Sequence, residues 1–429
     1  MEKLYLGVAR ENITPEIGCQ LYGYSGDIFS KSLHDRLCAT AFVFEQDGVL
    51  SALVSVTVCL IKTQLSIDIR KQIETETGIP YENIIIAATH THSGPNTRGN
   101  VGWGEIDNEY CQEIFVPRII EAVKTASENM QEVTVGYAYD NSLIGVNRRE
   151  LRADNTMGLG QCMWGPFDPR MTVICFKNTE GKLVASLVHY GCHCTAAGSN
   201  TEISQDWPGV MVKRMEKLTG AVCAFLNGPE GDVGPRLTNG RTGGDISYVE
   251  EHGGYAAHEA IRVFRKVNDY RQCDIKSATD KLNLKVKPRE DYEYAKAQYE
   301  RHKNADYGCN IQTRDYYERL VASYENGYTD KEFFAIEQTL IRIGNIIFVS
   351  FPYELFSEIG LRIQKETKDY IVLSLSNSNG SEGYFPTEDQ LCRGGYEIAM
   401  YYSANIQQFK PHADFNLISE TLKNIEKVI

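Results

Sequence analysis

Two histidines stand one residue apart where an apolar stretch of the chain ends. Residues Ile84–Ala88 are typical of a buried strand, and the segment Thr89–Pro95 that follows contains His90 and His92. In open α/β sheets, ligands bind at the carboxyl ends of strands. Because imidazole binds metals and carries protons, the pair predicts a metal site that acts on what the metal binds. The alternative is an ordinary strand end whose histidines are satisfied by loop contacts.

Four further polar side chains also follow apolar runs. They are His193, Asp232, Glu354 and Tyr384, which come after predicted strands at 183–190, 221–226, 339–351 and 371–375. Side chains at several strand ends can meet at one edge of a sheet, where histidine, carboxylate and phenol groups form a single site. The shared position after strands therefore predicts one active site.

The elements that must position these residues indicate an α/β fold. Residues 38–46 and 49–61 are predicted to form a hairpin, because Asp-Gly is a strong turn signal. A helix over 64–77, with Thr63 as its N-cap, leads into the strand at 84–88 and makes a β-α-β unit. The remaining predicted elements are helices at 108–128 (kinked at Pro117), from Pro208 and at 248–266, and strands at 133–139 and 171–177. The sequence therefore predicts a mixed β-sheet core flanked by helices.

Residues 288–330 differ in composition from the rest of the chain. They are rich in Tyr, Lys, Arg and Glu and predict two solvated helices that form an insertion. The insertion is either a lid over the site or a surface hairpin without a catalytic part. Because we find no repeat, linker or low-complexity tract, we expect residues 1–429 to form a single domain.

Charge and composition narrow the classes of partner. The 429-residue chain has a net charge of −13, which argues against nucleic acid as a partner. It contains no run of about 20 apolar residues, so no transmembrane segment is expected. We also expect a cytoplasmic location, because the N-terminus has no apolar signal sequence and the 12 cysteines include no CxxC pair. A small-molecule or lipid substrate fits this composition; the oligomeric state is not readable.

An ordered series of motifs resembles the neutral/alkaline, non-lysosomal ceramidases, in their N-terminal catalytic domain. The motifs are Asn12–Pro15, Gly23-Tyr24, Leu33–Asp35, Ala88–Pro95, Val146–Arg148, His193 in a Cys-His-x-Thr context, Gly231–Val233, Phe351–Glu354, Gly383–Thr387 and Gly395–Glu397. The Thr-His-Thr-His-Ser-Gly-Pro string is specific, and the resemblance extends over nearly the whole chain.

The resemblance implies a zinc enzyme of sphingolipid metabolism that hydrolyses the amide of N-acylsphingosine (ceramide). It implies that Zn²⁺ is bound by His90, His193, Glu354 and Tyr384. Two imidazoles and a carboxylate are common zinc ligands, and a bound cation can lower the pKa of a phenol enough for it to join them.

The resemblance also implies roles for residues around the metal. His92 would handle protons or steady the oxyanion, while Arg148 and Tyr396 would contact the scissile amide. Arg149 follows directly, which leaves the position of this arginine open by one residue. Asp232 would hold a water or orient a histidine, or it simply caps its glycine-rich turn.

Two departures from the family pattern affect the functional hypothesis. The known ceramidases carry a serine, treated as essential, after the Gly-Asp-Val triplet, whereas this chain has Gly234. The chain is also expected to lack the family's C-terminal β-sandwich domain. The leading hypothesis is a zinc-dependent amidohydrolase in which hydroxide formed at the metal attacks a secondary amide. The alternatives are a zinc hydrolase of the same fold for a different soluble N-acyl, ester or sugar-linked substrate, and a non-catalytic binding homologue.

Overall fold

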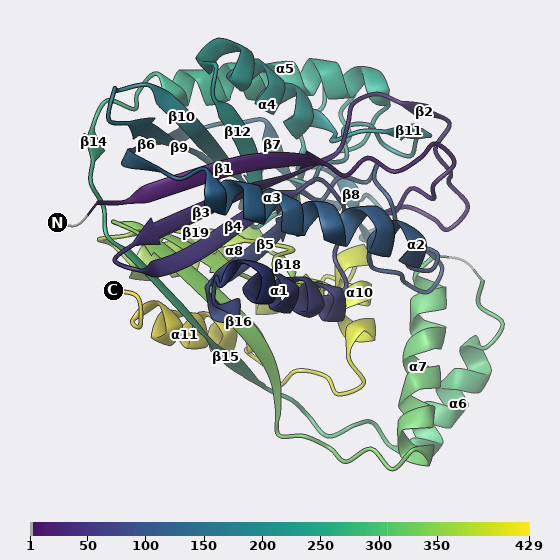
Figure 1. Ribbon diagram of the computed structural model, residues 1–429. Helices are drawn as coiled ribbons and strands as arrows, with labels where there is room; N and C mark the ends of the chain where they lie inside the picture. The colour runs from purple at the N-terminus through teal and green to yellow at the C-terminus, as the bar shows by residue number, and fades with distance from the viewer. Residues whose placement is uncertain (1–2, 307) are drawn as a thin grey trace.

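The structure is a computed structural model that describes residues 3–306 and 308–429, and it has four layers (Figure 1). Two β-sheets stack face to face in the middle, and helices cover the outer face of each sheet. The apolar layer between the sheets includes Phe42 and Phe176 from one sheet and Ile341 and Phe348 from the other. Burial of this shared layer explains why the sheets stack. The expected mixed sheet flanked by helices is confirmed.

The larger sheet contains both parallel and antiparallel strands. Its order is β12-β10-β9-β6-β1-β3-β4-β5, with β14 beside β6. The bounds are β1 (Tyr5–Asn12), β3 (Cys38–Gln46), β4 (Val49–Val56), β5 (Ile84–Ala88), β6 (Gln131–Asn141), β9 (Arg170–Asn178), β10 (Leu183–Tyr190), β12 (Val222–Asn227) and β14 (Tyr270–Arg271). The pairs β4–β5 and β10–β12 are parallel. Each of these parallel pairs therefore sends two chain segments to the same edge of the sheet.

Curvature of the larger sheet brings its two ends together. The hydroxyl of Ser55 in β4 donates to the carbonyl of Phe225 in β12 at 2.6 Å. At the carboxyl ends of β12 and β5, the side-chain amide of Asn227 donates to the carbonyl of Thr89 at 3.0 Å. The segments that follow β5, β10 and β12 are therefore neighbours, although β5 lies at the opposite end of the strand order from the adjacent strands β10 and β12.

The smaller sheet has the order β15-β16-β17-β19. Its bounds are β15 (Ile275–Lys285), β16 (Phe333–Ile343), β17 (Ile346–Ser350) and β19 (Ile371–Leu375). The single strand predicted over 339–351 is wrong, because the chain reverses at Gly344 (φ 58°) and β16 pairs with β17 in antiparallel fashion. The apolar residues on both sides of the turn concealed this reversal.

Helices cover both outer faces (Figure 1). On the larger sheet lie α1 (Thr63–Thr77), α3 (Val116–Glu128), α4 (Trp207–Thr219) and α5 (Ile246–Phe264); on the smaller sheet lie α8 (Ser357–Glu366) and α11 (Ala413–Ile425). Among the described residues, no helix has the length and apolar character needed to cross a membrane.

Two local predictions about helix ends need correction. Thr63 is not the N-cap of α1: Lys62 occupies that position, and the Thr63 hydroxyl donates to Glu382 Oε1 at 2.6 Å. The helix predicted over 108–128 is divided into α2 (Asn108–Tyr110), a π-helical turn η2 (Cys111–Phe115) and α3. Pro117 lies at the start of α3, where its missing N–H costs no helical hydrogen bond.

Short elements complete the fold around the strand ends. They are β2 (Ser32–Leu33), β7 (Gly145–Leu151), β8 (Met157–Cys162), β11 (Glu202–Ile203), β13 (Val233–Pro235), β18 (Glu354–Leu355), β20 (Tyr384–Phe385), α9 (Glu388–Leu391), α10 (Tyr396–Ala404) and the 3-10 turn η1 (Tyr81–Asn83).

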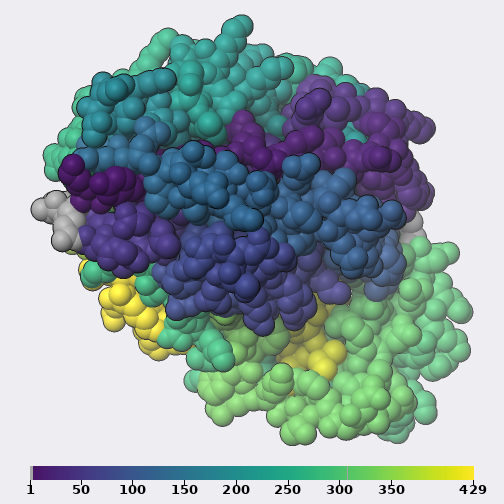
Figure 2. All heavy atoms as spheres, in the orientation of Figure 1, coloured from purple at the N-terminus to yellow at the C-terminus, as the bar shows by residue number. Residues whose placement is uncertain are grey.

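The predicted insertion at 288–330 forms two helices, α6 (Tyr292–His302) and α7 (Cys309–Glu325), as expected. They project beyond the ends of β15 and β16 (Figure 1) and form a light green lobe that lies beside the yellow surface of the C-terminal part in Figure 2. Tyr307, between the helices, lies outside the described residues. Since α7 packs against α10, the insertion is anchored to the body of the protein.

Candidate active site

The four predicted zinc ligands meet at one buried point. Nε2 of His193 lies 3.1 Å, and Nε2 of His90 lies 3.4 Å, from Oε2 of Glu354. The Tyr384 hydroxyl oxygen is 3.5 Å from Nε2 of His193. Each of the four residues is at most 5% exposed. Four chain segments that are distant in sequence therefore supply one cluster of donor atoms.

Backbone pairing explains why the two histidines converge. The segments after β5 and β10, which contain His90 and His193, run in parallel. Thr91 and Cys194 form a bridge, and the N–H of His92 donates to the carbonyl of Cys194 at 3.3 Å. His90 adopts φ 73°, and its N–H donates to the carbonyl of Val58 at 3.0 Å. A non-glycine residue with this φ costs on the order of 1–3 kcal/mol, a strain found at functional sites.

The carboxylate and the phenol come from a very short ladder. β18 and β20 pair in parallel over two residues, and Glu354 is the direct register partner of Tyr384. Because residues that are neighbours across a ladder project to the same face, both oxygens point toward the histidines.

The hydrogen bonds of the two imidazoles fit a metal site. Nδ1 of His90 lies 3.0 Å from the carbonyl of Cys59, and Nδ1 of His193 lies 2.8 Å from the carbonyl of Glu230. Each ring can donate Nδ1–H to the backbone, which leaves the Nε2 lone pairs facing Glu354. The two Nε2 atoms and the carboxylate oxygen lie within 4.8 Å of one another, a donor set that suits a divalent cation such as zinc.

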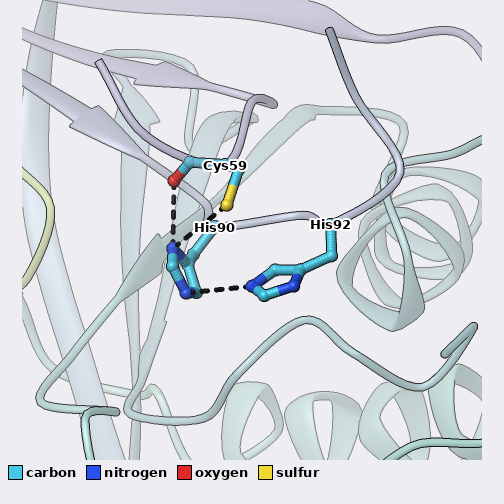
Figure 3. Close-up of side chains that lie close together, drawn as sticks. All are labelled: Cys59, His90 and His92. Atoms are coloured by element: carbon cyan, nitrogen blue, oxygen red, sulfur yellow. Dashed lines mark hydrogen bonds between the residues drawn. The ribbon is translucent and has the colours of Figure 1, made fainter. Parts of the chain in front are cut away.

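Cys59, His90 and His92 form a second cluster that shares His90 with the first (Figure 3). The Cys59 sulfur lies 3.7 Å from Nδ1 of His90, the nitrogen that already faces the Cys59 carbonyl. Burial also raises the pKa of the Cys59 thiol, which disfavours the thiolate. The first cluster is therefore the better candidate for the metal.

Electrostatics favour the ligand form of His193 and Glu354 but not of His90, from which a metal ion would have to displace a proton. Burial acts to lower the pKa of His90, but the neighbouring Cys59 and Glu354 outweigh it and raise that pKa well above its ordinary value. Burial, assisted by Arg148, lowers the pKa of His193 to about 3, so its ring is neutral. Burial acts to raise the pKa of Glu354, but the histidines outweigh it and hold that pKa well below its ordinary value. Burial and the Glu354 charge raise the pKa of Tyr384 well above 10. A phenolate at Tyr384 therefore requires a bound cation.

His92 lies between the ligand cluster and an open cavity. Its Nε2 is 3.2 Å from Nε2 of His90, as Figure 3 shows, and its ring packs edge-on against Tyr24 at 5.0 Å. Nδ1 of His92 is buried and has no hydrogen-bond partner among the described residues. Burial and the neighbouring histidines lower its pKa well below 6.5, so the free ring is neutral.

Alternation along β7 separates Arg148 from Arg149. Arg148 donates to the Tyr384 hydroxyl and to Glu397 Oε1, both at 2.9 Å, and it lines the cavity. Arg149 is not among the residues that line the cavity, and it donates to Glu397 Oε2 and to the Gly394 carbonyl, both at 2.7 Å. The structure therefore places Arg148 at the cavity, with Glu397 holding both guanidinium groups.

Tyr396 and Asp232 have different settings. Tyr396 begins α10, lines the cavity and lies with its ring centre 5.8 Å from that of Tyr384.

Asp232 accepts hydrogen bonds from the Ser357 N–H at 2.7 Å and from the Asn147 amide at 3.1 Å. Burial raises its pKa to about 7. Its observed contacts fasten the glycine-rich loop to the start of α8.

Sequence reasoning missed a second buried acid, Glu230. Its side chain is fully buried, and Oε1 lies 2.5 Å from the side-chain nitrogen of Asn377, which in turn is 3.2 Å from Nδ1 of His90. Burial raises the pKa of Glu230 to about 8. Only its place in the loop that contains Asp232 could have drawn attention to it.

A cavity of about 810 Å³ opens beside the cluster and receives His92, Arg148, Tyr384 and Tyr396. Gly308, Cys309 and Gln312 also line it, and the Gln312 amide donates to the Val101 carbonyl at 2.6 Å. The helical insertion therefore forms part of the cavity wall, although the sequence left this open.

A close contact with Thr242 explains why position 234 is a glycine in this chain. A Cβ atom at Gly234 would lie 2.6 Å from the Cβ of Thr242, a distance that real contacts do not reach. Thr242 lines the cavity. A serine at position 234 therefore requires Thr242 to move, and Thr242 supplies a hydroxyl in the same region.

Known ceramidases share the fold of this protein. A crystal structure of neutral ceramidase from Pseudomonas aeruginosa superposes with a TM-score of 0.76 at 18% identity, covering 100% of this chain and 75% of that chain. A structure described as ceramidase complexed with C2 gives a TM-score of 0.74 at 17% identity, covering 100% of this chain and 76% of that chain.

Sequence comparison defines the family. The model of the family described as neutral/alkaline non-lysosomal ceramidase, N-terminal, matches residues 4–253. Neutral ceramidase A of Dictyostelium discoideum is 27% identical over 245 residues, which is 52% of this chain and 34% of that protein. Neutral ceramidase of Pseudomonas aeruginosa is 25% identical over 251 residues, 54% of this chain and 37% of that protein.

The chain belongs to the neutral/alkaline non-lysosomal ceramidase family. It aligns with about a third of the length of these curated relatives. His90, His92, Arg148, His193 and Asp232 lie inside the part matched by the family model. The three candidates from the C-terminal part, Glu354, Tyr384 and Tyr396, lie beyond it, where the structural similarity extends.

Proposed function

We propose that this protein is a zinc-dependent hydrolase that cleaves a secondary amide, acting on N-acylsphingosine or a closely related lipid. The observation that carries the proposal is the convergence of His90, His193, Glu354 and Tyr384 at the wall of a large cavity. Membership of the ceramidase family supports the choice of reaction. We further propose that residues 1–429 act as one catalytic unit.

The four converging residues would hold the metal. The imidazoles of His90 and His193 offer Nε2, Glu354 offers a carboxylate oxygen and Tyr384 offers its phenol oxygen. A bound zinc ion supplies Lewis acidity, which polarises a carbonyl and acidifies water. Arg148, 2.9 Å from the Tyr384 hydroxyl, would balance negative charge on that oxygen.

Residues of the cavity wall would act on the amide. Arg148 keeps its proton and can donate hydrogen bonds to the oxygen that becomes negative as the carbonyl is attacked. Tyr396, also at the wall, would donate from its phenol to the same group. His92 is neutral and turns Nε2 toward the ligand cluster, so it would accept a proton from the attacking water and return it to the departing amine. Asp232 would act through its loop, because the next residue's carbonyl lies 3.1 Å from Nδ1 of His193.

A second candidate function keeps the same site but changes the substrate. Gly234 and the Thr242 side chain above it motivate a different soluble N-acyl, ester or sugar-linked compound. The third hypothesis is that the protein is a non-catalytic binding homologue. The cytoplasmic location expected from the sequence stays a prediction.

Metal content and turnover test the proposal together. Purified protein is expected to contain one zinc ion per chain and to release sphingosine from a short-chain N-acylsphingosine. His90→Ala and His193→Ala should lose both properties. His258→Ala is the matched control, because its side chain on α5 is 80% exposed. Zinc-free protein together with unchanged turnover in His90→Ala would refute the proposal, whereas tight zinc binding without hydrolysis of any amide or ester would favour the binding homologue.

A further inference from the structure

The cavity beside the proposed metal site has a positive lining. The charged residues that line it are Arg148, Glu150, Arg152 and Arg241, three arginines against one glutamate. Arg148 is already paired with Glu397. The other two arginines have no ion pair and no side-chain hydrogen bond among residues 3–306 and 308–429. The net charge of the whole chain is −13, so the positive charge of this cavity is opposite in sign to that of the protein and attracts an anion.

Glu150 shares a face of β7 with Arg148, and Arg152 continues this row as the first residue after the strand. Side chains alternate along a strand, so positions 148, 150 and 152 project to the same side, and all three line the cavity. The guanidinium of Arg152 lies over Gly158, where a Cβ would come within 2.2 Å of its Nε. The glycine in β8 thus leaves the space that the arginine occupies.

The loop that carries Arg241 is fixed in place although it is exposed. The Gln161 amide in β8 donates to the Leu237 carbonyl at 2.9 Å and to the Arg241 carbonyl at 2.7 Å. The N–H of Arg241 donates to the Asn239 side chain at 2.8 Å. These bonds hold the loop against β8, so Arg241 and Arg152 stand on adjoining parts of one wall.

We propose that Arg152 and Arg241 bind an anionic group of the substrate, a carboxylate or a phosphate, that lies several bonds from the scissile amide. This inference rests on the proposed hydrolase function. A strand rises about 3.3 Å per residue, so Cα of Arg152 stands about 13 Å along the wall from Cα of Arg148, which faces the amide. Glu150 lies between them and repels an anion attached close to the amide.

Among the secondary amides of the proposed function, the preferred substrate is therefore one related to ceramide that carries an anionic group several bonds from the amide, and uncharged ceramide itself is a poorer substrate. Guanidinium groups suit this role, because their planar donors match carboxylate and phosphate oxygens. Two arginines from different elements also define the direction in which the substrate enters.

Matched amides test the proposal. N-octanoyl-8-aminooctanoic acid and its methyl ester have the same chain length and differ in charge, whereas N-octanoylglycine carries its charge next to the amide on a shorter amine part. We expect kcat/KM for the long acid to exceed that for its ester by on the order of tenfold, and no such gain for the glycine compound. A phosphate monoester of the same length shows whether the site prefers a carboxylate or a phosphate. An isomer whose carboxylate is on the acyl part shows whether the anionic group belongs to the acid product or to the amine product.

Arginine variants assign the effect to residues. Arg152→Gln and Arg241→Gln should each lower the acid-to-ester ratio severalfold, and the double variant should bring it near one. Arg265→Gln is the control, because Arg265 is an exposed arginine at the end of α5, outside the cavity. Thermal unfolding of each variant shows that the fold is retained.

The outcomes separate this inference from the proposed function. Equal turnover of acid and ester, unaffected by either variant, overturns the anion site and leaves the hydrolase intact. If no amide is cleaved, the hydrolase proposal fails, and calorimetry of 8-aminooctanoate binding then decides the inference. Binding that the double variant abolishes supports it, and absence of binding overturns it.

Discussion

Replacing Gly23 with alanine should displace the histidine that we propose carries protons. A Cβ atom at Gly23 would lie 2.5 Å from both Cγ and Nδ1 of the His92 ring. An ordinary contact is about 3.5 Å, so the ring has to move by about 1 Å. A displacement of that size at a reacting group can cost about 10²-fold in rate. We therefore expect kcat to fall on that order while zinc content is unchanged.

The backbone provides a matched control for this substitution. Gly23 has φ 131°, so alanine there also strains the main chain by about 1–3 kcal/mol. Gly18 has φ 102°, but nothing lies within 4 Å of its Cβ position. Gly18→Ala therefore reproduces the strain without touching His92.

Three measurements decide the outcome. The free energy of unfolding, as measured in urea, should fall in both variants and further in Gly23→Ala, where the clash with the His92 ring adds to the backbone strain. Only Gly23→Ala should lose turnover of the amide substrate, and only its His92 ring signals should shift in NMR spectra. Full activity in Gly23→Ala, or an equal loss in Gly18→Ala, would refute the reasoning.

Three further predictions concern packing and charge. Gly234→Ser should lower the free energy of unfolding by about 1–3 kcal/mol without raising turnover, and adding Thr242→Gly should recover the stability in urea unfolding, because the clash is with the Thr242 Cβ. Burial lowers the pKa of His252 to about 4, so the unfolded chain binds a proton there between pH 6.5 and 4 that the folded protein does not. Stability should therefore fall by up to about 3 kcal/mol as the pH drops through this window, and urea unfolding of His252→Phe should lack that part of the loss. Glu397→Gln should cost about 3–5 kcal/mol, measured the same way, because it leaves the buried Arg148 and Arg149 without their carboxylate; unchanged stability would contradict the ion-pair arrangement.

Local sequence patterns predicted the elements whose ends are marked by clear turn signals. The turn at Asp47-Gly48 and the strand Ile84–Ala88 were found because turn residues and apolar runs act over a few positions. The position of His90 at a strand end follows from the same pattern. The reversal at Gly344 was missed because apolar residues continue on both sides of it.

Long-range contacts within the site lay beyond the reach of such patterns. Glu354 and Tyr384 are neighbours through a ladder of two residues, too short to leave a periodic signal. Their convergence was expected only from family resemblance. The choice between Arg148 and Arg149 required the strand register, and the hydrogen bonds of Glu230 join residues that are almost 150 positions apart. Such contacts depend on the tertiary fold rather than on local preference.

Anomalous X-ray scattering from crystals of the zinc-loaded protein tests the central claim most directly. Data collected on both sides of the zinc absorption edge should show one peak at about 2.0–2.2 Å from Nε2 of His90, Nε2 of His193 and an oxygen of Glu354, with the Tyr384 oxygen completing the set. A peak that these residues do not surround, or no peak in a protein that still hydrolyses the amide, would contradict the claim.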